Sequence, residues 1–175
     1  MLKKFSLTFL TFLLFISIFS SFSNSSNLST NEKKESPDSY LYPTTVTYTS
    51  STFGNRDLFG LSFHDGVDFP APKDSKIFAT KDGFVTFAGF TNGYGNMVTI
   101  MHSDGNKSLY GHMSETFIVR TGENVHRGDC IGYVGPKYLS NGVLNGYTTG
   151  PHLHFSVYNS KGKAINPLSL DLKKE

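Results

Sequence analysis

Glycine-containing turns divide most of this chain into short runs of β-branched and aromatic residues, and this punctuation limits the fold more than any other feature. The pairs Asp82-Gly83, Asn92-Gly93 and Asp104-Gly105 are turn signals between such runs. The 17 glycines suit tight turns, because glycine adopts positive φ angles readily. The sequence therefore predicts an all-β, antiparallel domain. Its expected strands include 76–80, 84–90, 97–102 and 108–113.

The first residues have the composition of an export signal. Lys3 and Lys4 precede an apolar run from Phe5 to Phe19, and small polar residues follow it. The run is short for crossing a hydrocarbon layer of about 30 Å, which favours a cleaved signal over a retained anchor. We expect residues 1–22 to be a signal peptide or membrane anchor, and the polar residues 23–45 a flexible, disordered linker. The rest of the chain is then exported, to the periplasm, the cell envelope or the medium.

Charge and cysteine content exclude two classes of function. Without Lys3 and Lys4, the 16 basic residues fall to 14 and balance the 14 acidic ones, so the chain lacks the basic excess of a nucleic-acid binder. A membrane partner is expected only if the N-terminal segment is retained. Cys130 is the single cysteine, so no internal disulfide can form. It lies in a short apolar run and is interpreted as a buried core residue rather than a catalytic thiol.

Two spacings among the six histidines indicate a metal site. Residues two apart on a strand point to the same face, so His152 and His154 can address one site. A straight strand would separate His64 from Asp68 by about 13 Å, so the chain must bend between them, and Asp65-Gly66 is a turn signal there. His64, Asp68 and one of the two later histidines would leave the fourth position open, as in catalytic zinc sites.

In their order along the chain, these residues and their surroundings resemble the motifs of the lysostaphin-type (LytM-domain) zinc peptidases of peptidoglycan. The matching segments are Ser51–Arg56, His64–Pro72, Phe78–Val85, Gly93–Asn96, Ile100–His102, Leu109–Met113, Val125–Gly132, Thr149–Phe155 and Asn166-Pro167. The resemblance covers residues 46–168, which form the expected metallopeptidase domain, and leaves 169–175 as a C-terminal tail. It implies a lysostaphin-type fold, a duplicated hybrid motif, with a substrate groove on an antiparallel sheet.

The resemblance also assigns roles to the histidines. It implies that His64, Asp68 and His154 bind one zinc ion per chain, and that His112 and His152 are the catalytic residues beside it. Two further histidines match no ligand position. We expect His102 to be a structural residue at a strand end and His126 to lie on the surface.

The chain departs from the family pattern at three places. The segment Pro136–Tyr147 is longer than the usual short turn and lies beside His152 in sequence. Ser156 stands where a Glu is common, and Asp74-Ser75-Lys76 replaces a turn that contains glycine. None of these changes removes a ligand or a catalytic histidine, so the longer segment is expected to affect substrate preference rather than chemistry.

The function that the resemblance implies is a zinc-dependent endopeptidase that hydrolyses peptide bonds in the stem or cross-bridge peptides of bacterial peptidoglycan. The chain contains no His-Glu-x-x-His motif, so a general-base Glu of that class is missing and the two catalytic histidines are expected to take its place. The alternative is a catalytically inactive wall-binding scaffold, or an activator of other wall hydrolases. The complete set of five site residues favours the enzyme.

Overall fold

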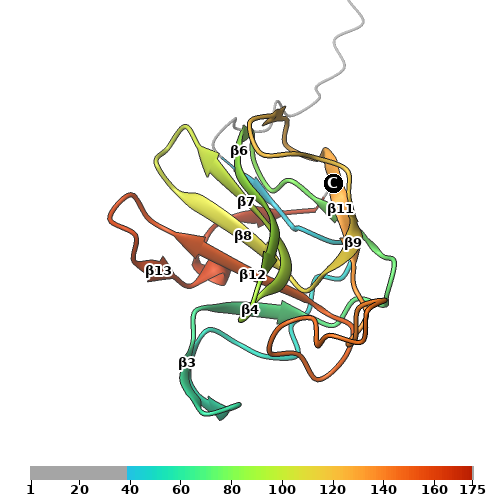
Figure 1. Ribbon diagram of the computed structural model, residues 1–175. Helices are drawn as coiled ribbons and strands as arrows, with labels where there is room; N and C mark the ends of the chain where they lie inside the picture. The colour runs from blue at the N-terminus through green and yellow to red at the C-terminus, as the bar shows by residue number, and fades with distance from the viewer. Residues whose placement is uncertain (1–38, 175) are drawn as a thin grey trace, which may run out of the picture. The chain divides into compact units, whose positions relative to one another are not determined.

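The computed structural model describes residues 39–174, which all belong to one compact unit (Figure 1). Within this range the protein is built from β-strands and a single 3₁₀ turn, η1, and no helix is long and apolar enough to cross a membrane. The all-β prediction is therefore confirmed. The expected signal segment and most of the linker lie outside the described residues. The elements are β1 (Tyr40–Leu41), β2 (Gly54–Leu58), β3 (Leu61–His64), β4 (Gly66–Phe69), β5 (Lys76–Phe78), β6 (Gly83–Thr91), β7 (Gly95–His102), β8 (Lys107–Gly111), β9 (Met113–Phe117), β10 (Asn124–Val125), β11 (Cys130–Val134), β12 (Leu153–Tyr158), β13 (Ala164–Ile165), η1 (Pro167–Ser169) and β14 (Leu172–Lys173).

The largest sheet has the strand order β10-β6-β7-β8-β12-β13, and β4 also pairs with β12. Strands β6, β7 and β8 follow one another as antiparallel hairpins, which agrees with the turn signals that separate them in sequence. The C-terminal strand β12 then pairs with both β8 and the early strand β4. Figure 1 shows β12 lying between these elements. This insertion brings the two ends of the domain to one place.

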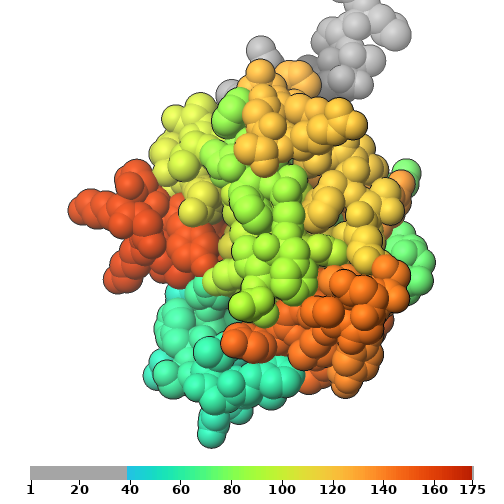
Figure 2. All heavy atoms as spheres, in the orientation of Figure 1, coloured from blue at the N-terminus to red at the C-terminus, as the bar shows by residue number. Residues whose placement is uncertain are grey.

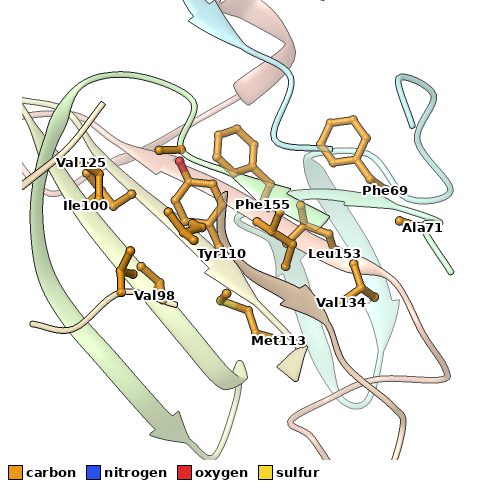
Figure 3. Packing of buried hydrophobic residues seen from close by; sticks show 14 of the residues in the cluster. Phe69, Ala71, Val98, Ile100, Tyr110, Met113, Val125, Val134, Leu153 and Phe155 are labelled. Carbon is orange, nitrogen blue, oxygen red and sulfur yellow. The ribbon is translucent and has the colours of Figure 1, made fainter. Parts of the chain in front are cut away.

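A second antiparallel sheet, β5-β11-β9, contributes to the same hydrophobic core. Figure 3 shows Phe69, Tyr110, Met113, Val134 and Phe155 directed toward one another from strands of both sheets. Each of these side chains is completely buried. Leu153 and Phe155 alternate with His152 and His154 along the chain, so apolar residues of β12 enter the core while the imidazoles face the other side.

The β2–β3 hairpin pairs with no other strand of the described chain (Figure 1). Its turn contains Phe59 at φ 55° and Gly60 at φ 72°, two left-handed residues in succession. The hairpin exposes Leu58, Phe59, Leu61 and Phe63, with 38–47% of each residue accessible. A projecting apolar hairpin of this kind forms one wall beside the candidate site described below.

The folded region differs from the expected limits at both ends. Tyr40 and Leu41, expected in the flexible linker, form β1 and are buried. They pair in parallel with Leu172 and Lys173 of β14, which was expected to be tail. Two-residue strands carry no detectable periodicity, and their pairing depends on contacts between the ends of the chain. The Cys130 side chain is half-buried rather than part of the buried core.

Candidate functional site

Strand pairing brings three side chains of the predicted metal site together. In the β12–β4 ladder His154 lies directly opposite Asp68, and facing pairs of this kind have neighbouring side chains. His64 ends β3, and the chain bends at Asp65 before β4 begins, as the Asp65-Gly66 turn signal predicts. The His64 Nε2–His154 Nδ1, His154 Nδ1–Asp68 Oδ1 and His64 Nε2–Asp68 Oδ1 distances are 3.0, 3.0 and 3.2 Å. All three residues are buried.

The arrangement of protons on these imidazoles suits a cation. His64 Nδ1 lies 2.9 Å from the carbonyl oxygen of Thr52, which can only accept, so this nitrogen carries the proton and Nε2 offers a lone pair. His154 Nε2 faces Ser156 Oγ at 2.7 Å and Asp65 Oδ1 at 3.4 Å, which leaves Nδ1 as the lone-pair nitrogen. Two lone pairs and a carboxylate oxygen then converge.

The spacing of the three donors fits a tetrahedral zinc ion. Zinc binds imidazole nitrogen and carboxylate oxygen at about 2.0–2.2 Å, which places neighbouring ligand atoms about 3.3 Å apart. The measured separations of 3.0–3.2 Å are close to this value. Three donors would leave a fourth coordination position of such an ion open, as in catalytic zinc sites.

Carboxylates make the site favourable for positive charge. Burial alone would raise the pKa of Asp68, but the imidazoles of His154 and His64 hold it well below its usual range. Burial would lower the pKa of His154, yet the neighbouring carboxylates of Asp65 and Asp68 raise it above the ordinary value. Arg56 Nη1 lies 3.4 Å from Asp68 Oδ2, so it contacts the carboxylate oxygen that is not part of the donor cluster.

Asp65 forms an outer layer behind His154. Its carboxylate accepts hydrogen bonds from the hydroxyls of both Tyr94 and Tyr158. Burial and the hydrogen bond to Asp65 raise the pKa of Tyr158 to about 12, and they also raise that of Tyr94, so both phenols stay protonated as donors. Gly66 allows this close packing, because a Cβ there would lie 2.5 Å from Ser156 Oγ and 2.9 Å from His154 Cε1.

The two expected catalytic histidines lie beside the donor cluster. The ring centroids of His112 and His152 are 4.7 Å apart, and His152 Nε2 is 3.6 Å from Asp68 Oδ1. Each Nδ1 faces a backbone carbonyl, that of Asn145 at 2.7 Å for His112 and that of Gly150 at 2.9 Å for His152. Each Nε2 therefore presents a lone pair to the site.

Both of these imidazoles are neutral near pH 7. Burial, reinforced by the neighbouring His152 and His154, lowers the pKa of His112 to about 3. Burial also lowers the pKa of His152, although Asp68 opposes the shift. A neutral imidazole keeps one ring nitrogen free to accept a hydrogen bond or a proton.

A pocket of about 320 Å³ opens onto the cluster. Its apolar walls come from Leu61 and Phe63 of the β2–β3 hairpin and from Tyr147, and His112 and His154 also line it. The Phe59 and Tyr147 rings stack across this region with centroids 6.1 Å apart. Figure 2 shows the hairpin in blue-green, the β6–β7 turn in yellow-green and the segment around Tyr147 in orange meeting on one face. The longer segment Pro136–Tyr147 thus helps to form the pocket.

The remaining histidines lie where the sequence places them. His102 ends β7, is buried, and bonds to the Asp82 carbonyl at 2.9 Å and to Ser108 Oγ at 2.8 Å. His126 is highly exposed. Sequence reasoning did not identify Asp65, Tyr94, Tyr158 or Asn145 as site residues. Asp65 lies within the His64–Asp68 motif, and this position is the one signal in the sequence that could have identified it. The other three residues come from distant segments.

Comparisons with known proteins agree with this arrangement. The model of peptidase family M23 matches residues 62–167. The DD-carboxypeptidase/endopeptidase Mpg of Neisseria meningitidis is 39% identical over 133 residues, which cover 74% of this chain and 28% of that protein. The murein hydrolase activator NlpD of Escherichia coli is 36% identical over 123 residues, covering 70% of this chain and 27% of its own length. The chain thus aligns with about a quarter of each of these relatives.

Two solved structures share the fold. A zinc-containing peptidase from Vibrio cholerae superimposes with a TM-score of 0.65 and 27% identity, covering 77% of this chain and 41% of that one. The catalytic domain of lysostaphin from Staphylococcus simulans gives a TM-score of 0.59 and 29% identity, with coverage of 70% and 90%. The antiparallel fold is thus of the lysostaphin type. With the family model matching more than half of its length, the chain belongs to peptidase family M23.

Proposed function

We propose that the protein is a zinc-dependent endopeptidase that hydrolyses peptide bonds in the stem or cross-bridge peptides of bacterial peptidoglycan. The observation that carries this proposal is the convergence of His64 Nε2, His154 Nδ1 and Asp68 Oδ1 at mutual distances of 3.0–3.2 Å, with two further imidazoles beside them. The similarity to Mpg and to lysostaphin supports peptidoglycan peptides as the substrate class. We propose an exported location, since that substrate lies outside the cytoplasm.

The proposed metal ligands are His64, Asp68 and His154, holding one zinc ion per chain. Zinc bound there would polarise the scissile carbonyl and make a bound water more acidic. His112 and His152 are proposed as the catalytic residues. Each offers an Nε2 lone pair, so either can accept the proton of the attacking water, and the imidazolium formed can then donate to the departing amine.

Single substitutions separate metal binding from catalysis. His64→Ala should lose both zinc and hydrolysis of purified peptidoglycan, because one of three donors is missing. His152→Ala should retain about one zinc per chain and lose hydrolysis, because this residue acts on protons rather than on the ion. His126→Ala, which removes an exposed histidine, is the matched control. Zinc loss in His152→Ala would mean that the proposed ligand and catalytic roles are exchanged.

A second candidate function is activation of another wall hydrolase, which the similarity to NlpD favours. The two functions differ in what the purified protein does alone. An endopeptidase releases new peptide termini from peptidoglycan, chelator stops the release, and mass spectrometry of the products identifies the bond. An activator releases nothing by itself, and its effect on a partner hydrolase survives His152→Ala.

A further inference from the structure

The segment Pro136–Tyr147 connects β11 to β12 and contains a completely buried polar residue, Asn145. Most of the segment is exposed, and a bridge between Tyr138 and Leu144 closes it into a loop. The buried position of a polar residue within an exposed loop requires an explanation, because burying an amide costs free energy unless its hydrogen bonds are made.

The Asn145 side chain makes hydrogen bonds at both ends of its amide. Nδ2 donates to the carbonyl oxygens of Met113 at 3.0 Å and Pro136 at 3.2 Å, and Oδ1 accepts from the backbone N–H of Asn96 at 2.9 Å. Gly95, at φ 67°, leaves room for this contact, since a Cβ there would lie 2.3 Å from Asn145 Oδ1. The amide thus fastens the loop to the start of β7 and to the β8–β9 corner.

The backbone of Asn145 reaches a proposed catalytic residue. Its carbonyl oxygen accepts a hydrogen bond from His112 Nδ1 at 2.7 Å. His112 lies at the β8–β9 corner with φ 57°, an uncommon conformation for a residue with a side chain. Its own N–H donates to the Tyr94 carbonyl at 2.8 Å, and its carbonyl accepts from Gly135 at 2.9 Å. The corner is held from three sides, and one of them is the Asn145 loop.

We propose that Asn145 is a positioning residue. Its side-chain amide fixes the peptide carbonyl that selects the Nδ1–H form of His112 and directs Nε2 into the site. Through Asn145, the longer segment then supports a catalytic residue, in addition to lining the pocket through Tyr147. The kinetic part of this inference rests on the proposed function, whereas the protonated position on His112 can be measured without any activity.

The test substitutes Asn145→Asp in the zinc-loaded full chain. The aspartate retains an acceptor for Asn96 N–H but places an oxygen against the carbonyls of Met113 and Pro136, so the loop must shift. Asn141→Asp is the matched control, because Asn141 is exposed and its side chain bonds to Val143 N within the loop. We expect kcat on peptidoglycan peptides to fall about 100-fold in Asn145→Asp, with KM and zinc content unchanged, because small misplacements of catalytic groups cost factors of this size.

Nitrogen-15 NMR of the histidine side chains supplies a measurement that is independent of catalysis. Wild-type His112 should show the proton on Nδ1, with and without zinc, and Asn145→Asp should lose this form while Asn141→Asp keeps it. A wild-type His112 protonated on Nε2 would overturn the proposal, as would a kcat for Asn145→Asp within twofold of the control. If Asn145→Asp does not fold, the wild-type spectrum alone decides. A protein with the Nδ1–H form but no hydrolysis contradicts the proposed function and leaves the positioning role standing.

Discussion

The carboxylate of Asp65 offers a sharp test of how the proposed metal site is built. Its Oδ1 is 3.4 Å from His154 Nε2, longer than a good hydrogen bond, whereas Ser156 Oγ is at 2.7 Å. Asp65 should therefore act on His154 mainly through its charge. Asp65→Asn keeps the shape and removes that charge. Because metal-bound imidazole becomes more positive, the substitution should weaken zinc binding.

The magnitude follows from the geometry. Unit charges about 5 Å apart interact by about 3 kcal/mol at an effective dielectric constant of about 20. The Asp65 side chain is 26% exposed, so solvent reduces this value. A loss of about 1.4–2.8 kcal/mol remains, which corresponds to a 10- to 100-fold weaker zinc affinity and matches the usual effect of removing an outer partner of a metal ligand.

Competition with a chromophoric zinc chelator measures this affinity directly. Ser156→Ala should weaken binding less than tenfold, because it removes a neutral partner and leaves Asp65 in place. Asp171→Asn removes an exposed carboxylate that is paired with Lys173, and should leave the affinity unchanged. Equal affinities for Asp65→Asn and wild type would refute the idea that Asp65 stabilises the bound state through His154.

Three further outcomes are expected. Phe155→Ala should lower the free energy of unfolding by about 3–5 kcal/mol in urea titrations, because it empties a completely buried position, and a loss below 1 kcal/mol would contradict the packing described. Burial would raise the pKa of Asp104, but the hydrogen bond from Lys81 lowers it, so this pair should stabilise the fold near neutral pH and lose its effect as the pH falls through the acidic range. Asp104→Asn should therefore destabilise the protein at pH 7 and have little effect at pH 2, and a pH-independent difference would be inconsistent with this linkage. Tyr147→Ala should raise KM for peptidoglycan peptides more than it lowers kcat, because it removes an apolar wall of the pocket, whereas an unchanged KM would mean that substrate does not occupy this pocket.

Local patterns predicted where most strands lie, because turn residues act over a few neighbouring positions, but the expected strand 108–113 ends at Gly111, where His112 at φ 57° turns the chain into β9. The expected strand 84–90 lies within β6, and the bend between His64 and Asp68 falls where its turn signal lies. Such local patterns cannot predict which strands pair when they lie far apart in the chain. The β1–β14 ladder joins the ends of the domain through two-residue strands, so neither strand has enough length to show a period.

The same distinction applies to the candidate site. Spacing and family resemblance together predict a metal site at His64, Asp68 and His154, and the fold brings their donor atoms together. The sequence does not predict a role for Asn145 in the site, because an asparagine in a polar, glycine-containing segment resembles an ordinary turn residue. Its importance depends on backbone groups of Met113 and Asn96, whose proximity appears only after the sheets have formed.

The pairing of β4 with β12 also sets when the donor cluster can exist during synthesis. His64 and His154 are 90 positions apart in the chain. A nascent polypeptide whose synthesis has not yet reached His152 and β12 contains two of the three donors and lacks His152 as well. Any zinc binding or hydrolysis that depends on all three donors would therefore require a chain that has been synthesised through β12.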